Sequence, residues 1–133
     1  MEKKDEKLLF TDICARTPYN VLVRNIKLNF DGYVMSPSRY QPLSVLTYDL
    51  SGGEDQGFSP IEDIRPYLRP MSSMTDEERK EYLLTWKDEP LMRQVKVPVT
   101  ETDDWLEAHH FDYRGLIEKG LALEAPEGMY DDR

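Results

Sequence analysis

The sequence predicts an α+β fold, in which a small, bent antiparallel sheet or partial β-barrel is covered by three or four short helices. Strand-type patterns concentrate in residues 19–58, whereas helical spacing of apolar residues dominates most of the remaining chain. The two kinds of segment do not alternate regularly, as they would in a parallel α/β sheet. Because the chain has 133 residues, we expect one domain that spans residues 1–133.

The first predicted element is a helix over residues 3–16. Leu8, Leu9 and Ile13 recur there at helical spacing. Pro18 follows at the point where the helix must end, because a proline disfavours helical geometry in the residue before it.

The next elements are predicted strands over residues 19–33 and 43–50, which are rich in β-branched and aromatic residues. Asp31 and Gly32 interrupt the first of these segments. Both residues tolerate the positive φ that a two-residue type I′ hairpin turn requires. We therefore expect the chain to turn at this pair, with the flanking aromatic residues facing each other across the turn.

Residues 59–125 are predicted to be mainly helical, with one edge strand near residues 92–99. Ser59, followed by Pro60 and Glu62, has the pattern of a helix N-terminus, with an N-cap, a proline at the first helical position and a capping-box acid. This segment is therefore expected to begin with a short helix.

Thr75 and Glu78 provide the clearest local signal in the chain. They have the spacing of a capping box, which predicts a helix over residues 75–87. A last helix is expected over residues 102–119. After it, residues 126–133 are expected to form a loose tail.

The net charge of the chain excludes several partners. At −9, the chain is a poor ligand for DNA or RNA, because nucleic-acid binding needs basic residues that displace counterions from phosphates. The same sign argues against binding to anionic membrane surfaces. Cys14 is the single cysteine, so that no internal disulfide can form and a reducing compartment is favoured. Since no stretch resembles a signal sequence or a membrane span, we expect a cytoplasmic protein.

Both histidines of the chain are adjacent, at His109 and His110, with Asp112 close behind. Neighbouring side chains on a helix point about 100° apart, and the usual helical zinc pair is spaced i, i+4. The chain also has no third histidine. We therefore interpret the pair as a helix C-terminus and Asp112 as the N-cap of a short following helix. The less favoured interpretation is a polar site in which one histidine acts as a base beside Asp112.

A second candidate site surrounds the sequence IRPYLRP. Arg65 and Arg69 bracket Tyr67, and two arginines around an aromatic ring are suited to bind an anion or an acidic peptide. The alternative is that the arginine stems cover apolar surface while their charged ends pair with acids of the same chain.

Three blocks of the sequence carry a resemblance to a known family. They are DICARTPYNVLV (12–23), GFSPIEDIRPYLRPMSSMTDEE (57–78) and WLEAHHFDYRGLIEKGLALEAPEGMY (105–130), and together they cover about half of the chain. In these blocks the chain resembles a family of small proteins encoded by Bacteroides-type gut bacteria and their phages or prophages. The resemblance implies a bacterial or phage cytoplasm and a mobile-element setting. It implies no activity, cofactor or catalytic residue.

These observations favour a non-enzymatic binding or accessory protein that acts through protein–protein contacts, as a monomer or homodimer. We assign no catalytic residue, cofactor or metal. One alternative is a metal-assisted hydrolase that uses His109, His110 and Asp112. Another is an acidic mimic of DNA, which is weakened because 17 basic residues are interspersed with the 26 acidic ones.

Overall fold

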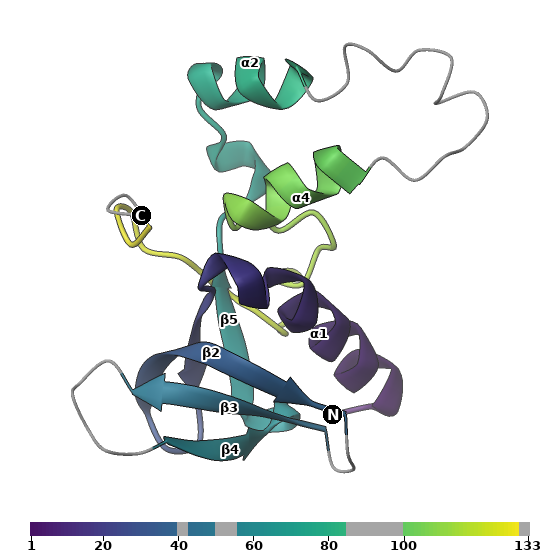
Figure 1. Cartoon of the computed structure of the whole chain (residues 1–133), viewed down its shortest axis with the longest axis vertical. Coiled ribbons are helices and arrows are strands. Elements are labelled where there is room, and N and C mark those ends of the chain that lie inside the picture. Colours follow the sequence, from purple (N-terminus) through teal and green to yellow (C-terminus); the bar gives the residue numbers. More distant parts are fainter. Residues whose placement is uncertain (40–42, 50–55, 85–99, 131–133) are drawn as a thin grey trace.

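The computed structural model describes residues 1–39, 43–49, 56–84 and 100–130 of the chain (Figure 1). Short 3₁₀ turns are interspersed among its helices and strands. The helices and strands in chain order are α1 (Lys3–Arg16), β1 (Leu22–Asn25), β2 (Phe30–Ser38), β3 (Ser44–Asp49), β4 (Gln56–Pro60), β5 (Ile64–Leu68), α2 (Asp76–Leu84), α4 (Thr100–Ala108) and β6 (Leu123–Glu124).

The α+β prediction is confirmed, because the strands form one open sheet accompanied by helices. The strand order is β4-β3-β2-β1-β5-β6, and neighbours are antiparallel except for β5 and β6, which run parallel. The sheet does not close on itself, so the partial barrel is not formed and the sheet is mixed. The parallel pair arises from β6, a strand of two residues that carries no alternating pattern long enough to predict it.

α1 covers one face of the sheet, which we call the inner face (Figure 1). Strand side chains alternate between faces, and the pairing register places Val23, Val34 and Val45 on this inner face. Leu9 and Ile13 of α1 are fully buried against it, and the predicted helix over residues 3–16 is confirmed. The buried core comprises Leu9, Phe10, Ile13, Val21, Val23, Val34, Val45, Ile61, Ile64, Leu68, Leu116, Leu121 and Ala122.

The prediction of a two-residue hairpin turn at Asp31 and Gly32 is wrong. Both residues lie inside β2, where they pair with Arg24 and Val23 of β1. The chain turns earlier, at residues 26–29. Gly32 is not among the described glycines that have positive φ.

Asparagines make this turn instead of the Asp-Gly pair. The Asn25 side-chain oxygen accepts the backbone N–H groups of Lys27 and Leu28, at 3.0 and 2.8 Å. Asn29 adopts a φ of 58°, which asparagine tolerates better than most residues. Asparagine therefore supplies both the side-chain acceptor and the left-handed residue that the turn needs.

The prediction of a helix N-terminus at Ser59 and Pro60 is also wrong. Ser59 is buried in β4 opposite Val45, and its hydroxyl accepts a hydrogen bond from Asn25 Nδ2 at 3.1 Å. Only a 3₁₀ turn, Ile61–Asp63, follows, and it has no side-chain cap. Pairing with β3 consumes the serine that the local pattern had assigned to capping.

The helix expected over residues 102–119 is shorter in the structure. α4 ends at Ala108, and His110 adopts a φ of 64°, a left-handed conformation that is common just after a helix. The residues between α4 and β6 form turns and an isolated bridge between Arg69 and Phe111. The segment predicted to be mainly helical therefore also contributes β5, β6 and a long irregular connection.

The expected loose tail is anchored over its described part. The Tyr130 hydroxyl donates to the Tyr67 carbonyl at 2.8 Å and accepts the Leu22 N–H at 3.0 Å. Residues 131–133 and the strand predicted near residues 92–99 lie outside the described residues.

Candidate functional site

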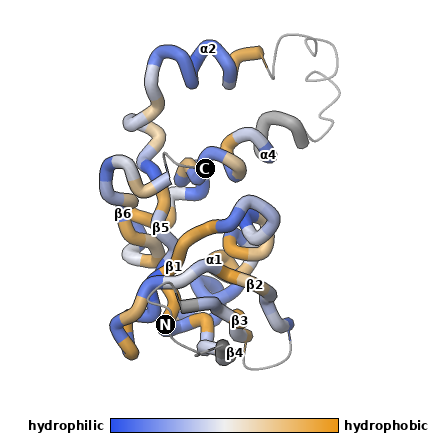
Figure 2. Tube along the Cα trace, turned by 60° about the vertical axis from the view of Figure 1, so that its left-hand side comes forward, coloured by the Kyte–Doolittle hydropathy of each residue, from blue (hydrophilic) through white to orange (hydrophobic). Residues whose placement is uncertain are grey.

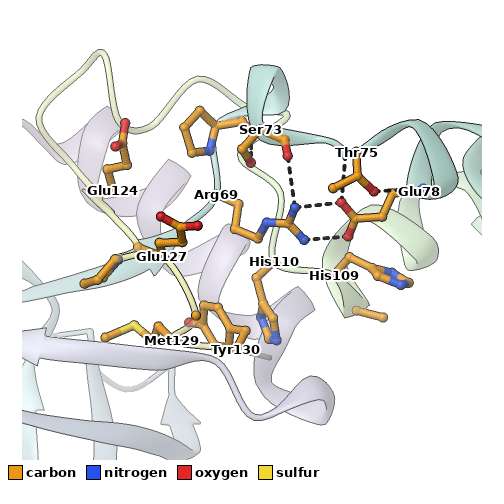
Figure 3. A pocket seen from close by; sticks show the side chains of 15 residues that line it. Arg69, Ser73, Thr75, Glu78, His109, His110, Glu124, Glu127, Met129 and Tyr130 are labelled. Atoms are coloured by element: carbon orange, nitrogen blue, oxygen red, sulfur yellow. Dashed lines mark hydrogen bonds and ion pairs between the residues drawn. The ribbon is translucent and has the colours of Figure 1, made fainter. Parts of the chain in front are cut away.

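A polar pocket of about 820 Å³ lies between the end of β5, the start of α2, the end of α4 and the C-terminal segment (Figure 3). Arg69 lies in it and donates to both carboxylate oxygens of Glu78, at 2.7 Å each. The Arg69 guanidinium also lies over the Phe111 ring, 4.2 Å from its centroid. The hydrogen bonds from Arg69 lower the pKa of Glu78 from 4.5 to about 2. Arg69 is thus already bound by a carboxylate of its own chain.

Glu78 is also part of the predicted capping box, which is confirmed. Thr75 Oγ1 accepts the Glu78 N–H at 3.1 Å, and Glu78 Oε1 accepts the Thr75 N–H at 3.0 Å. The sequence pattern did not predict that the same carboxylate binds Arg69. The end of the helix expected at residue 87 lies outside the described residues.

His109 and His110 line the pocket, but their rings stack on different aromatic partners. The His109 ring stacks on Trp105 with centroids 3.9 Å apart, and its Nδ1 lies 2.8 Å from the Trp105 carbonyl oxygen. His110 is 4% exposed and stacks on Tyr130 with centroids 3.7 Å apart. These contacts favour a packing role for both rings over the polar site with Asp112.

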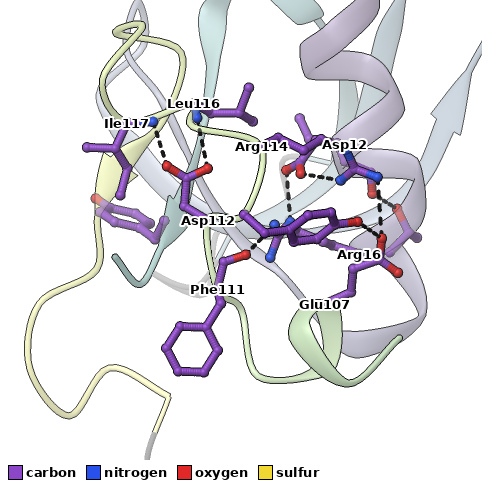
Figure 4. A network of polar contacts seen from close by, with 12 residues as sticks. Asp12, Arg16, Glu107, Phe111, Asp112, Arg114, Leu116 and Ile117 are labelled. Atoms are coloured by element: carbon purple, nitrogen blue, oxygen red, sulfur yellow. Dashed lines mark hydrogen bonds and ion pairs between the residues drawn. The ribbon is translucent and has the colours of Figure 1, made fainter. Parts of the chain in front are cut away.

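Asp112 organises the loop that follows the histidines (Figure 4). Its carboxylate accepts the N–H groups of Leu116 and Ile117, at 2.8 and 2.9 Å. We expected Asp112 to accept backbone N–H groups at the start of a helix. It does accept them, but the chain continues as turns with positive φ at Gly115 and Gly120, so no helix forms.

A buried ionic network joins α1 to the same loop (Figure 4). Asp12 and Arg16, both fully buried, are linked by an Arg16 Nε donor at 2.8 Å, and Arg16 Nη2 donates to the Phe111 carbonyl at 2.6 Å. Arg114 Nη1 donates to the other Asp12 oxygen at 2.6 Å and Arg114 Nη2 to Glu107 at 3.4 Å. Since its members mainly bond one another and the backbone, we interpret this network as structural.

The structure separates the three residues of the predicted arginine–tyrosine site. Arg65 and Tyr67 lie on the face of the sheet opposite the inner face, which we call the outer face. Arg65 Nη1 donates to two backbone carbonyls at 2.9 Å each, and the Tyr67 hydroxyl donates to Asp31 at 2.7 Å. Arg69 instead turns to Glu78. The three residues therefore do not form one anion grip.

The outer face carries an apolar cluster that the sequence analysis did not single out. Phe58 of β4 pairs with Leu46 of β3, and Tyr48 of β3 pairs with Tyr33 of β2. The two tyrosine rings stack with centroids 5.3 Å apart. Phe58 is 60% exposed, and the other three side chains are half-buried. We call these four residues the outer patch. Their alternation along each strand was the available sequence signal, but the pairing that joins them is not a local property.

A cationic group borders the outer patch. In the next rows of the sheet, Asp31 and Arg65 both pair in register with Arg24. Arg24 Nη1 donates to Asp31 at 3.0 Å, so this acid is neutralised. Within the described residues, Arg65 forms no ion pair with an acid, and burial lowers the pKa of its guanidinium. The border of the patch is therefore positive on a chain whose net charge is −9.

No group of three or more histidine, cysteine, aspartate or glutamate side chains suited to hold a metal ion is found among the described residues. In the same part of the chain, every helix is too short or too polar to cross a membrane. Comparison with known proteins found no matching family model, curated protein or solved structure. The functional argument therefore depends on the geometry of the chain itself.

Proposed function

We propose that the protein is a non-enzymatic binding protein whose outer patch docks a segment of another protein. The observation that carries this proposal is the outer patch itself. Phe58, Leu46, Tyr48 and Tyr33 form a continuous apolar row across three strands on the face that α1 leaves uncovered. Aromatic residues with low conformational entropy are typical anchors of protein interfaces.

The charges beside the patch define the partner further. Arg65 offers a guanidinium that no acid of the described chain neutralises, next to the Arg24–Asp31 pair. The partner that fits is a segment with apolar side chains for the patch and a carboxylate for Arg65, since arginine binds carboxylates in a planar fork. The resemblance to proteins of gut bacteria and their phages supports a partner in a bacterial or phage cytoplasm.

Site-specific photo-crosslinking in the host tests this proposal. A photoreactive phenylalanine analogue replaces Tyr48 in the outer patch, and the matched control carries it at Thr11, an exposed position of α1. We expect one partner protein to be linked from position 48 and not from position 11. The purified partner should then bind the wild-type protein, with an affinity that falls as salt rises.

A charge variant separates specific docking from adhesion. Arg65→Glu should abolish binding of the purified partner, whereas Arg65→Lys should retain part of it, because only the former repels an acidic segment. Equal crosslinking from both positions would refute the proposal. So would a crosslinked partner whose binding is the same for wild type and Arg65→Glu.

A further inference from the structure

β4 is the terminal strand of the sheet order, and the direction of its outward backbone groups follows from one hydrogen bond. The Ile61 N–H donates to the Leu43 carbonyl at 2.9 Å, which extends the β3–β4 ladder by one pair. Bonded and non-bonded pairs alternate in an antiparallel ladder. Hence Gln56, Phe58 and Pro60 turn their backbone N–H and C=O groups away from β3.

This edge lacks the usual protection against strand pairing. Natural edge strands are commonly blocked by charged side chains, bulges or covering segments. The sequence of β4, QGFSP, contains no charged residue, and Phe58 is 60% exposed. At Gly57, a Cβ would meet no heavy atom within 4 Å, so the backbone is also uncrowded on the other face. Among the described strands, only β3 pairs with β4.

We propose that β4 pairs antiparallel with β4 of a second copy of this chain, with the two-fold axis at Phe58. The five residues of β4 overlap completely only in this register. Each Phe58 then donates to and accepts from its counterpart, and each Gln56 N–H reaches the Pro60 carbonyl of the other copy. Pro60 has no N–H to leave unbonded, so the proline is accommodated at the end of the pairing.

Charge favours a meeting at this edge over other parts of the surface. Two chains of net charge −9 repel each other, and the repulsion is smallest where acids are absent. β4 has no charged residue and β3 has only Asp49 at its end. The two exposed Phe58 rings face each other across the axis, and an aromatic cross-strand pair stabilises such an edge.

A dimer of this kind is weak and reversible, because a five-residue edge falls well below the buried area of about 1,200–2,000 Å² that permanent interfaces use. It would place the outer faces of two copies side by side in one continuous sheet. The inference does not depend on the proposed partner of the outer patch, since it uses the strand edge and not Arg65.

Sedimentation velocity of the full-length protein over the micromolar concentration range tests the dimer. The wild-type sedimentation coefficient should rise with concentration towards that of a dimer. Phe58→Pro should weaken the dimer by at least about tenfold, because it removes an outward donor from each copy while leaving the β3 ladder intact. Leu28→Asp is the control, since Leu28 is exposed in the turn before β2 and away from this edge. It should dimerise as the wild type does.

A charge exchange makes the register falsifiable even if Phe58→Pro fails to fold. Phe58→Asp and Phe58→Lys place like charges opposite each other at the axis, so each variant alone should stay monomeric. An equimolar mixture should form a heterodimer. A wild-type protein that remains monomeric throughout the concentration range would overturn the inference. A mixture that remains monomeric, while the wild type dimerises, would overturn it as well.

Discussion

The two helices α1 and α2 are attached to the molecule in different ways. α1 buries Leu9, Phe10, Asp12, Ile13 and Arg16, whereas α2 has no buried residue, and Leu83 and Leu84 on it are more than half exposed. Figure 2 shows α2 as a mostly hydrophilic tube at one end of the molecule. It is held by the Arg69–Glu78 ion pair, by a Trp105 Nε1 donor to Glu81 at 3.1 Å, and by the Tyr82–Trp105 ring contact.

The difference shows that a strong local helix signal and a strong tertiary attachment are separate properties. α2 has the clearest capping signal in the chain but depends on partly exposed polar and aromatic contacts. α1 has no side-chain cap and depends on the core and on a buried ion pair. We therefore expect substitutions in α1 to unfold the whole domain and substitutions in α2 to release only that helix.

The largest effect is expected for Asp12→Ala. The substitution leaves the fully buried Arg16 without its carboxylate, and breaking a buried ion pair in this way costs about 3–5 kcal/mol. The free energy of unfolding from urea denaturation measures the cost. Replacement of the exposed Glu2, which pairs with Lys4 at the surface, is the control and should change stability by less than about 1 kcal/mol. Equal effects at the two positions would break the comparison.

A matched pair of leucines compares the two helices directly. Leu9→Ala should cost about 2–5 kcal/mol, because it leaves a cavity in the core. Leu83→Ala should change the global free energy of unfolding by less than about 0.5 kcal/mol, because Leu83 is 55% exposed. A comparable loss at both positions would mean that α2 is part of the cooperative core.

Asp112→Ala tests the loop that closes over α1. It removes the acceptor of the Leu116 and Ile117 N–H groups, which should cost about 1–3 kcal/mol. Asp112→Asn is the conservative control and should recover part of the loss through its side-chain oxygen. A neutral Asp112→Ala variant in thermal unfolding would show that water or other groups satisfy these donors.

The smallest and most local effect is expected from acid. The pKa of Glu78 is about 2 in the folded chain, below its ordinary value of 4.5. Its stabilising effect is therefore complete above pH 4.5 and is lost as the pH falls towards 2. Hydrogen exchange of the α2 amides should increase over this range while the β1 and β2 amides stay protected longer. Glu78→Gln should raise α2 exchange at neutral pH and remove most of its dependence on pH. An α2 that exchanges together with the sheet would contradict this expectation.

The candidate sites were predictable only as far as their signals were local. Thr75 and Glu78 were found from their spacing, because a capping box is formed by residues three apart. The backbone bonds of Asp112 were also foreseen, although the helix they were meant to begin does not form. The outer patch was missed because its neighbours, such as Phe58 and Leu46, are adjacent only through strand pairing.

The sequence by itself determined the α+β class, the helix over residues 3–16, the start of α2 and the strand that became β3, since apolar periodicity and capping act within a few residues. Only the tertiary structure decided the position of the first hairpin turn and the length of α4. Asp31 and Gly32 carry a good turn signal, yet pairing of β2 with both β1 and β3 places them in a strand. Ser59 is a good N-cap, yet a buried bond to Asn25 uses it elsewhere. In each case, contacts between distant residues stabilise the chain more than the local preference does.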